Sequence, residues 1–247
     1  MPSIKNDDKS RVIIRPGFYW DRMPAYLFDI DGTLLRSRDR VHASAFAAGV
    51  RRVTGLEITL EGVPTAGNTD TAILVEAWRL TGLDASLLVS QAGAIRAAMA
   101  EWVSEHQNEL DMILMPGVEA ALSHLASRNA LLGVATGNLE AIGWLKLTRA
   151  GLRDWFRLGG FSDSFLIRAE MVANAAEKAR QMLAQPEAVV CVVGDTPRDI
   201  AAARWAGLPV VAVATGHTSF DELLALQPEV CATTLGDLLA ATVGEQR

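Results

Sequence analysis

The chain has 247 residues, of which 50% are hydrophobic and 21% are charged, and its formal net charge at pH 7 is −6. These proportions are close to those of ordinary globular proteins and exclude a disordered chain, a collagen-like fibre and a charge-stabilised coiled coil. The negative charge provides no basic surface for a phosphate backbone, so we expect no nucleic acid partner. Since domains have about 150 residues, we expect one large domain or a core with a smaller companion.

The cysteine count and the hydropathy pattern indicate the compartment. Cys191 and Cys231 are too few for a disulfide framework, and Cys191 lies in the apolar run of residues 188–193, where we expect it to be buried. No apolar run approaches the ~18 residues of a membrane span, and the N-terminal residues carry mixed charges without a secretory apolar stretch. We expect a soluble protein of the reducing cytoplasm with no membrane partner.

In chain order, residues 1–24 have clustered charges and two prolines without sustained periodicity, and we expect an extension outside the main core. After it, short apolar runs end in small polar residues, which predicts buried strands followed by tight loops. Helical spacing of apolar residues lies between these runs, so the pattern predicts a doubly wound parallel α/β sheet with a Rossmann-like core. The predicted strands are residues 25–30, 131–135, 188–193 and 209–214, and the predicted helices are 139–150, 169–183 and one that begins at Thr196 and Pro197.

The segment 37–112 interrupts this alternation. It contains no strand pattern but three helical patterns, at residues 41–54, 69–81 and 85–110. About 75 residues are too many for a simple crossover, so we expect an inserted helical cap domain at 37–112 and a catalytic core made of 25–36 and 113–247. A lobe that is tethered at both ends beside a strand terminus is well placed to open and close over a site.

Polar side chains follow three of the predicted strands. Asp29 and Asp31 follow the first strand, Thr136 the second and Asp195 the third. The carboxyl ends of parallel strands meet at one edge of the sheet, so these groups can converge. Two carboxylates about 4 Å apart repel each other by about 4 kcal/mol at an effective dielectric constant near 20, and a cluster of them calls for a cation. An all-oxygen ligand set favours Mg²⁺ and phosphoryl chemistry.

The run Asp29-Ile30-Asp31-Gly32-Thr33 closely resembles the DxDGT signature of the haloacid dehalogenase superfamily. The resemblance continues at residues 136–138 (Thr-Gly-Asn) and 194–199 (Gly-Asp-Thr-Pro-Arg-Asp), and it covers residues 25–240 including the helical insertion. The segments 67–70 and 214–216 are similar to the phosphoglycolate phosphatase-like branch. The resemblance implies a Mg²⁺-dependent phosphatase that hydrolyses a small phosphorylated metabolite, such as a phosphoglycolate-like ester or a sugar phosphate.

The resemblance also implies roles for individual residues. Asp29 is expected to be the nucleophile that forms an aspartyl phosphate, and Asp31 the general acid and base. Mg²⁺ is expected at the carboxylates of Asp29 and Asp195 and at the backbone carbonyl of Asp31. The expected phosphate-binding and supporting residues are Thr136, Gly137 and Asn138, with Asp199 assisting the metal site. Taken singly, each of these residues also fits a turn or helix-cap role, Asp199 at the start of its helix in particular.

The sequence departs from the family pattern where a lysine normally balances the nucleophile. Here residues 166–170 read Leu-Ile-Arg-Ala-Glu, and Arg168 is aligned with the family lysine. A guanidinium can bind carboxylate and phosphate together, although it is bulkier than an ammonium. Lys178 is the competitor, but ten residues along a helix place its backbone roughly 15 Å away. We expect Arg168 to be the catalytic and phosphate-binding cation.

Dehalogenation, carbon-phosphorus cleavage, phosphomutase activity and phosphate acceptance without turnover are alternatives to phosphatase activity. The acid at position 31 favours phosphoryl transfer over dehalogenation, and no lysine lies between residues 10 and 145 to form the cap Schiff base of a carbon-phosphorus hydrolase. A sugar phosphomutase of the same superfamily and a phospho-acceptor module without turnover stay open. In the cap, Gly67, Asn68, Thr69 and His42 could contact substrate, although turn, cap and surface roles fit them as well. The sequence leaves the physiological ester and the choice between a monomer and a homodimer open.

Overall fold

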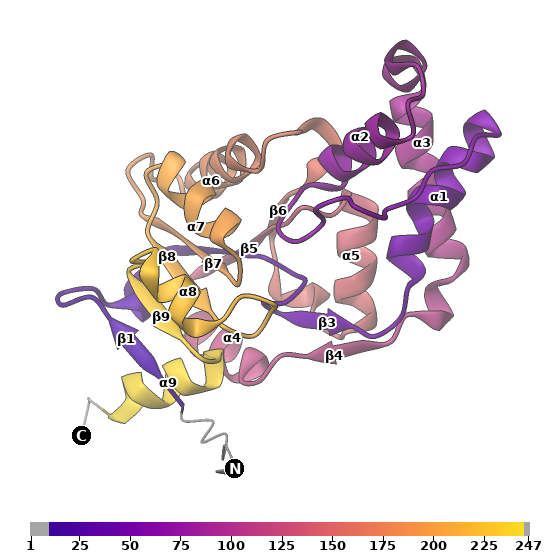
Figure 1. Ribbon diagram of the computed structural model, residues 1–247. Helices are drawn as coiled ribbons and strands as arrows, with labels where there is room; N and C mark the ends of the chain where they lie inside the picture. The colour runs from indigo at the N-terminus through magenta and orange to yellow at the C-terminus, as the bar shows by residue number, and fades with distance from the viewer. Residues whose placement is uncertain (1–9, 245–247) are drawn as a thin grey trace.

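The computed structural model describes residues 10–244, which form a central sheet flanked by helices, with a further group of helices beside it (Figure 1). The strands of the sheet are β1 (Val12–Ile14), β2 (Ala25–Phe28), β5 (Leu131–Ala135), β6 (Leu158–Gly160), β7 (Val190–Gly194), β8 (Val210–Val213) and β9 (Val230–Ala232). The helices around it are α4 (Val118–Ser127), α5 (Glu140–Arg149), α6 (Arg168–Leu183), α7 (Pro197–Trp205), α8 (Phe220–Ala225) and α9 (Leu235–Gly244).

The strand order across the sheet is β1-β9-β8-β7-β2-β5-β6. Every neighbouring pair is parallel except β1 and β9. Strand β2 lies between β5 and β7, so the chain leaves it toward one side of the sheet and later returns to its other side. Such a switch point opens a crevice at the carboxyl ends of the strands. The predicted doubly wound, mostly parallel α/β fold is confirmed.

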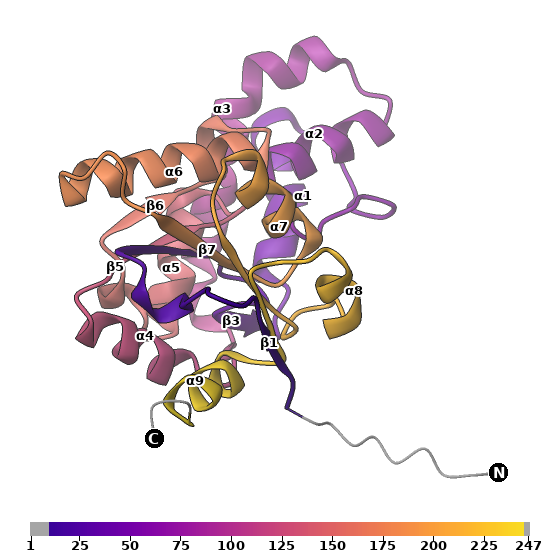
Figure 2. The ribbon, with the colours of Figure 1, turned by 90° about the vertical axis from the view of Figure 1, so that its left-hand side faces the viewer.

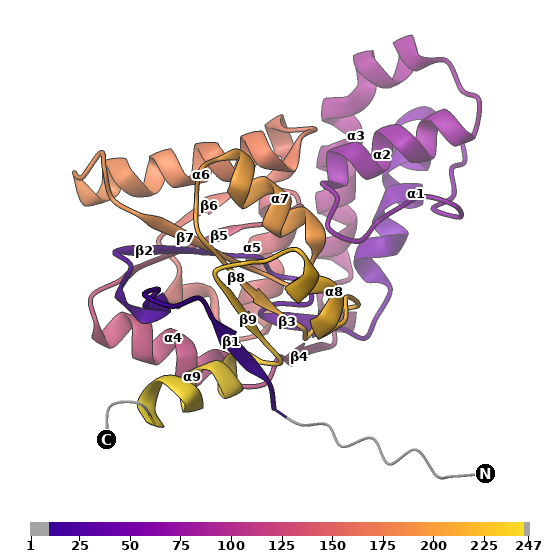
Figure 3. The ribbon, with the colours of Figure 1, turned by 60° about the vertical axis from the view of Figure 1, so that its left-hand side comes forward.

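Helices cover both faces of the sheet. Helices α6 and α7 lie on one face, and α4 and α9 lie on the other (Figures 2 and 3). Successive residues of a strand point to opposite faces, so Leu27 of β2 packs in the core beneath α6 while Phe28 packs in the core that contains Leu147 of α5. Burial on both faces explains why the strands appear in the sequence as continuous apolar runs.

Helices α1 (Val41–Thr54), α2 (Asp70–Leu80) and α3 (Ala85–Glu105) form a lobe beside the sheet, called the helical lobe below (Figure 1). The lobe has its own core, in which Phe46, Trp78 and Met99 are buried. Two short antiparallel strands, β3 (Leu35–Ser37) and β4 (Met112–Leu114), form the ribbon that joins the lobe to the sheet. Three helices therefore lie within residues 37–112, and strand structure is confined to the two ends of this segment.

The N-terminal segment differs from the prediction. Strand β1 pairs with β9, Val12 opposite Ala232, and the side chain of Trp20 is only 1% exposed. The expectation that residues 1–24 lie outside the main core is therefore wrong for residues 12–24; residues 1–9 are outside the described part of the chain. The segment lacked periodicity because β1 is a three-residue edge strand, too short to show alternation.

The two cysteines and the hydropathy of the helices are as follows in the structure. Cys191 in β7 and Cys231 in β9 are both buried and are not joined in a disulfide. Cys191 packs in the sheet core, as expected for a small apolar side chain. Within residues 10–244, no helix combines the length and the apolar character needed to cross a lipid bilayer.

The burial of Trp20 makes the contribution of the N-terminal segment measurable. Its indole Nε1 donates a hydrogen bond to Thr242 Oγ1 at 2.6 Å, which ties this segment to α9. We expect Trp20→Ala to lower the free energy of unfolding by about 3–5 kcal/mol, because it removes a large buried side chain. Tyr19→Ala, at a side chain that is 57% exposed, should cost less than about 1 kcal/mol. Urea unfolding followed by circular dichroism checks both, and equal small losses would contradict the integration of this segment.

Candidate active site

Three side chains from neighbouring strands meet at the carboxyl edge of the sheet. Asp29 follows β2, Thr136 follows β5 and Asp195 follows β7, and all three line one cavity. The pairing of β2 with both neighbours fixes this convergence, and the backbone N–H of Asp29 extends the ladder by donating to Val193 O at 2.9 Å. The convergence predicted from strand ends is observed.

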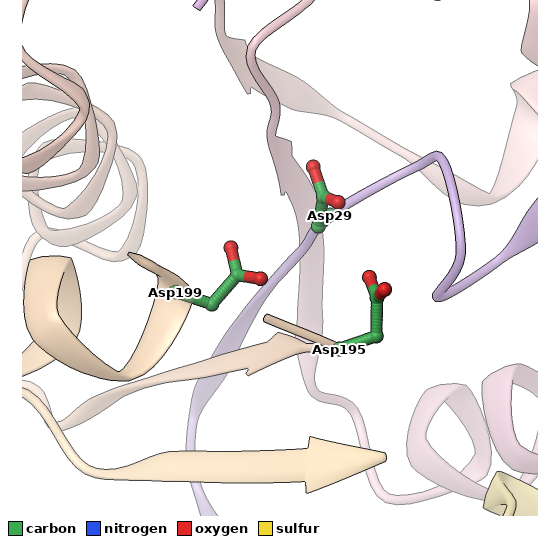
Figure 4. A group of neighbouring side chains, drawn as sticks. All are labelled: Asp29, Asp195 and Asp199. Carbon is green, nitrogen blue, oxygen red and sulfur yellow. The ribbon is translucent and has the colours of Figure 1, made fainter. Parts of the chain in front are cut away.

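A cluster of carboxylates lies on one side of this meeting point. Oxygens of Asp29, Asp195 and Asp199 lie within 4.8 Å of one another, and all three side chains are buried (Figure 4). Arg168, the first residue of α6, contacts two of these carboxylates, with Nη2 at 2.8 Å from Asp29 Oδ1 and 2.5 Å from Asp199 Oδ1. Within residues 10–244, the salt bridges of this group all come from Arg168. With all three carboxylates ionised, one guanidinium would leave two negative charges unbalanced. This donor set suits a divalent, oxygen-binding cation.

The cluster perturbs the ionisation of its members. Burial raises the pKa of Asp29 to about 6, although Arg168 opposes the shift. Burial, together with the charges of Asp29 and Asp199, raises the pKa of Asp195 to about 8. Burial works against the charged form of Arg168, but Asp199 and Asp29 outweigh it and raise its pKa above the usual value. Perturbed carboxylates in a cleft are a common mark of a functional site.

Two glycines allow Asp195 to sit this close to the first motif. A Cβ at Gly32 or at Gly216 would overlap the Asp195 carboxylate. Gly32 also has a φ of +93°, a conformation that other residues rarely adopt. The Asp195 carboxylate accepts a hydrogen bond from Thr33 Oγ1 at 2.9 Å. The Asp-Gly-Thr turn therefore holds the carboxylate of the third motif.

Asp199 has a structural role as well as a place in the cluster. It is the third residue of α7, and its Oδ2 accepts hydrogen bonds from the backbone N–H and the hydroxyl of Thr196, at 3.0 and 2.7 Å. Thr196 Oγ1 in turn accepts from the Asp199 N–H, which completes a capping box. The helix-cap role and the position beside Arg168 are thus both observed.

Asp31 points toward the second motif instead of the carboxylate cluster. Its Oδ2 accepts a hydrogen bond from Asn138 Nδ2 at 2.8 Å, and the same amide group donates to Thr136 Oγ1 at 2.7 Å. The metal role expected for Asp31 concerns its backbone carbonyl and not this carboxylate. Gly137 lies at the base of the lobe, where a Cβ would overlap the carbonyl oxygen of Asn68.

The sequence interpretation missed Lys146. This residue of α5 is buried, and its Nζ lies 2.8 and 2.7 Å from the two carboxylate oxygens of Asp31. Burial disfavours ionisation of Asp31, but Lys146, His42 and the hydrogen bonds it accepts outweigh this and hold the pKa of Asp31 below its usual value. The sequence did contain a signal, because Lys146 lies four residues after Ile142 on the buried face of its helix.

The helical lobe is seated on the core beside these groups. The backbone N–H of Asp70 donates to Gly137 O at 2.7 Å, and the Asp70 carboxylate accepts from the N–H of Leu139 at 2.8 Å. Thr71 Oγ1 donates to Ser162 O at 2.7 Å. These contacts dock the first turn of α2 against the loops that follow β5 and β6.

The lobe residues singled out from the sequence have local roles here. Thr69 caps α2 by accepting from the Ala72 N–H, and it donates to Leu166 O. Asn68 Nδ2 donates to Pro64 O at 2.7 Å, within its own loop. Gly67 and Asn68 nonetheless line the cavity, so their contact with a ligand stays a prediction.

The cavity between lobe and core has a volume of about 370 Å³. The core contributes Asp29, Asp31 and Arg168 to its wall, and the lobe contributes His42 and Phe46. The size is that of a small-molecule site. Lys178 is exposed and lies against Gly159 O at 3.4 Å, whereas Arg168 contacts Asp29 directly.

Comparisons with known proteins agree with this geometry. A family model described as haloacid dehalogenase-like hydrolase matches residues 23–207. A phosphoglycolate phosphatase from Synechococcus elongatus is 30% identical over 224 residues, which cover 89% of this chain and 97% of that protein. The probable phosphatase IndB from Dickeya dadantii is 27% identical over 233 residues, with 88% and 93% covered.

A solved structure of a haloacid dehalogenase-like family hydrolase from Streptococcus pneumoniae has a TM-score of 0.58 at 22% identity, and covers 89% of this chain and 98% of that one. This likeness concerns the fold. The family match, in contrast, includes all three sequence motifs and the helical lobe between the first two. The resemblance drawn from the motifs is confirmed, and the chain belongs to the haloacid dehalogenase-like hydrolases.

Proposed function

We propose that this hydrolase is a Mg²⁺-dependent phosphatase that cleaves a small organic phosphomonoester through an aspartyl-phosphate intermediate. The observation that carries the proposal is the pairing of a buried Asp29 with Arg168 at 2.8 Å on the wall of a 370 Å³ cavity, with Asp31 two residues further on. Phosphatases among the relatives, including the Synechococcus phosphoglycolate phosphatase, support it.

In the proposed first step, an Asp29 oxygen attacks phosphorus and the bond from phosphorus to the ester oxygen breaks. Where the departing oxygen needs a proton, Asp31 takes one up from solvent, against the lowered pKa that Lys146 imposes, and passes it on. In the second step a water oxygen attacks phosphorus, Asp31 accepts a proton from that water, and the bond from phosphorus to the Asp29 oxygen breaks. Inorganic phosphate leaves and the Asp29 carboxylate is restored. Arg168 touches Asp29 and is placed to balance negative charge on the transferred group, and Thr136 is placed to hydrogen-bond it.

The carboxylate cluster supports a metal at this site. We propose that Mg²⁺ is held by the carboxylates of Asp29 and Asp195 and by the backbone carbonyl of Asp31, with Asp199 assisting the metal site. When all three carboxylates are ionised, the two negative charges that Arg168 leaves unbalanced fit a divalent cation. When bound, the ion would screen nucleophile and phosphate from each other and stabilise negative charge on the phosphoryl oxygens.

The cavity wall carries cationic groups that can bind a small anion. Arg36, Lys146 and Arg168 line it beside five aspartates, so we propose that these cations act together with bound Mg²⁺ in attracting the phosphate group. The enclosed volume accommodates a phosphorylated metabolite of a few carbons. A phosphoglycolate-like ester and a sugar phosphate both fit this description.

The nucleophile is tested with p-nitrophenyl phosphate in the presence of Mg²⁺ or EDTA. We expect many turnovers per enzyme with Mg²⁺, release of inorganic phosphate, and a loss of more than about 10³-fold in kcat for Asp29→Asn. Asp221→Asn, at an exposed surface aspartate, is the matched control and should keep wild-type activity. Metal-independent turnover that survives Asp29→Asn would refute the mechanism. A single turnover that leaves phosphorylated protein would indicate a phospho-acceptor module, and an isomerised ester in place of free phosphate a mutase.

The metal is tested by thermal unfolding without substrate. At a Mg²⁺ concentration about 100 times its Kd, we expect a stabilisation of about 2.7 kcal/mol, which raises Tm by about 5–10 °C. Asp195→Asn should abolish this increase. Its metal-free form should be at least as stable as the wild type, because an amide is more easily buried than a carboxylate. A Mg²⁺-induced shift of wild-type size in Asp195→Asn would exclude Asp195 as a ligand.

The cation beside the nucleophile is tested by comparing Arg168 with Lys178. Arg168→Met leaves Asp29 and Asp199 buried without their partner, so we expect a loss of about 3–5 kcal/mol in the free energy of unfolding in EDTA and a loss of turnover. Arg168→Lys should recover part of both. Lys178→Met should change stability by less than about 0.5 kcal/mol and leave turnover intact. Urea unfolding and p-nitrophenyl phosphate kinetics decide, and a larger loss from Lys178→Met would reverse the assignment.

A further inference from the structure

Lys146 is a buried cation that the proposed mechanism does not use. Its side chain is 2% exposed, and its Nζ contacts Asp31, Asn138 Oδ1 at 2.8 Å and His42 Nδ1 at 3.0 Å. A lysine ammonium has three N–H donors, and acceptors on three residues surround this one. Burying an ammonium is costly unless it is paired. Because this ammonium has a partner for each of its donors, the Lys146 side chain is held in one defined position.

These contacts fix the orientation of the Asp31 carboxylate. Lys146 contacts both of its oxygens, and Asn138 Nδ2 contacts Oδ2 as well. The side chain of Asp31 still keeps 41% of its surface exposed, and the residue lines the cavity. One edge of the carboxylate is therefore held by the core while the remainder faces the space where a substrate or water would lie.

The helical lobe completes this arrangement through His42. Lys146 can only donate, so His42 Nδ1 is the acceptor, and its Nε2 is left to donate to Asp70 Oδ2 at 2.9 Å. His42 also stacks on Phe46, which fixes the plane of its ring. Asp31, Lys146, His42 and Asp70 thus form a continuous polar chain from the first motif to the start of α2.

We propose that Lys146 is a positioning residue that holds Asp31 as an oriented carboxylate facing the water that hydrolyses the aspartyl phosphate, with His42 fixing Lys146 from the lobe. The inference rests on the proposed function. A carboxylate whose orientation is fixed in this way is suited to accept a proton from a nearby water, which is the task of Asp31 in the second step. Without Lys146, the Asp31 carboxylate would rotate more freely, and it would less often face the water in the orientation that a base needs.

The two steps can be separated kinetically. With p-nitrophenyl phosphate, kcat/KM reports formation of the aspartyl phosphate, whereas kcat includes its hydrolysis. The p-nitrophenolate ion departs without needing a proton, so the first step depends little on Asp31. A general base contributes about 10²–10⁴-fold to the rate of its step.

For Lys146→Met, we expect kcat to fall at least about 10-fold and kcat/KM to fall much less, with a burst of p-nitrophenol. Phosphorylated protein, measured by intact-mass spectrometry after rapid acid quench, should accumulate above the wild-type level. His42→Phe keeps the ring stacking on Phe46 but removes the acceptor, and it should show the same pattern more weakly. Lys178→Met is the control for loss of a lysine and should match the wild type in all three measurements.

Other outcomes separate this inference from the proposed function. Equal losses of kcat and kcat/KM in Lys146→Met without accumulated phosphoenzyme would indicate a purely structural lysine and overturn the inference alone. Unchanged kinetics in both variants would overturn it too. If the wild type turns over no phosphomonoester, the proposed function fails and this inference fails with it. His42→Phe keeps the test decisive if Lys146→Met does not fold.

Discussion

The ion pairs of Arg168 with Asp29 and Asp199 set the charge around which this site is built. One terminal nitrogen, Nη2, makes both contacts, so a single side chain joins the carboxylate that follows β2 to the one on α7. The planar guanidinium fixes the direction of its N–H bonds, which the freely rotating ammonium of a lysine would not do. The replacement of the usual family lysine by arginine at this position is accommodated because Asp199 lies within reach and is itself anchored by its capping box.

The sequence allowed much of this geometry to be predicted, for a simple reason. In a parallel sheet the polar residues that follow neighbouring strands share one edge, so the positions of Asp29, Thr136 and Asp195 followed once the strands were recognised. The place of Lys146 in the site could not be predicted in this way. It lies eight residues after Asn138 of the second motif, and the direction of a helical side chain depends on how the helix packs. The available clue was that the lysine lies on the same apolar helix face as Ile142. This clue indicates a buried ion pair only when a partner such as Asp31 is known to lie opposite.

The helical lobe and the core are joined by polar contacts as well as by the β3 and β4 ribbon. The Asp70 carboxylate receives hydrogen bonds from the core, at the Leu139 N–H, and from the lobe, at His42. Leu139 and Ile142 of the core also pack into the lobe's own apolar cluster. The periodicity of residues 37–112 predicted the helices of the lobe but could not predict this docking, which depends on loops from distant parts of the chain.

The pairing of β1 with β9 has a consequence for how the protein is made. Among residues 10–244, β1 precedes every other strand, and its neighbour in the sheet is β9, the last of them, so β1 is synthesised long before its partner. The hydrogen bond of the Trp20 indole likewise forms only after α9, which carries Thr242, has been synthesised. The central strands and the lobe can assemble earlier in translation, but this edge of the sheet closes only after β9 has been synthesised. A nascent chain stalled before β9 would therefore carry an unpaired strand open to association with other chains.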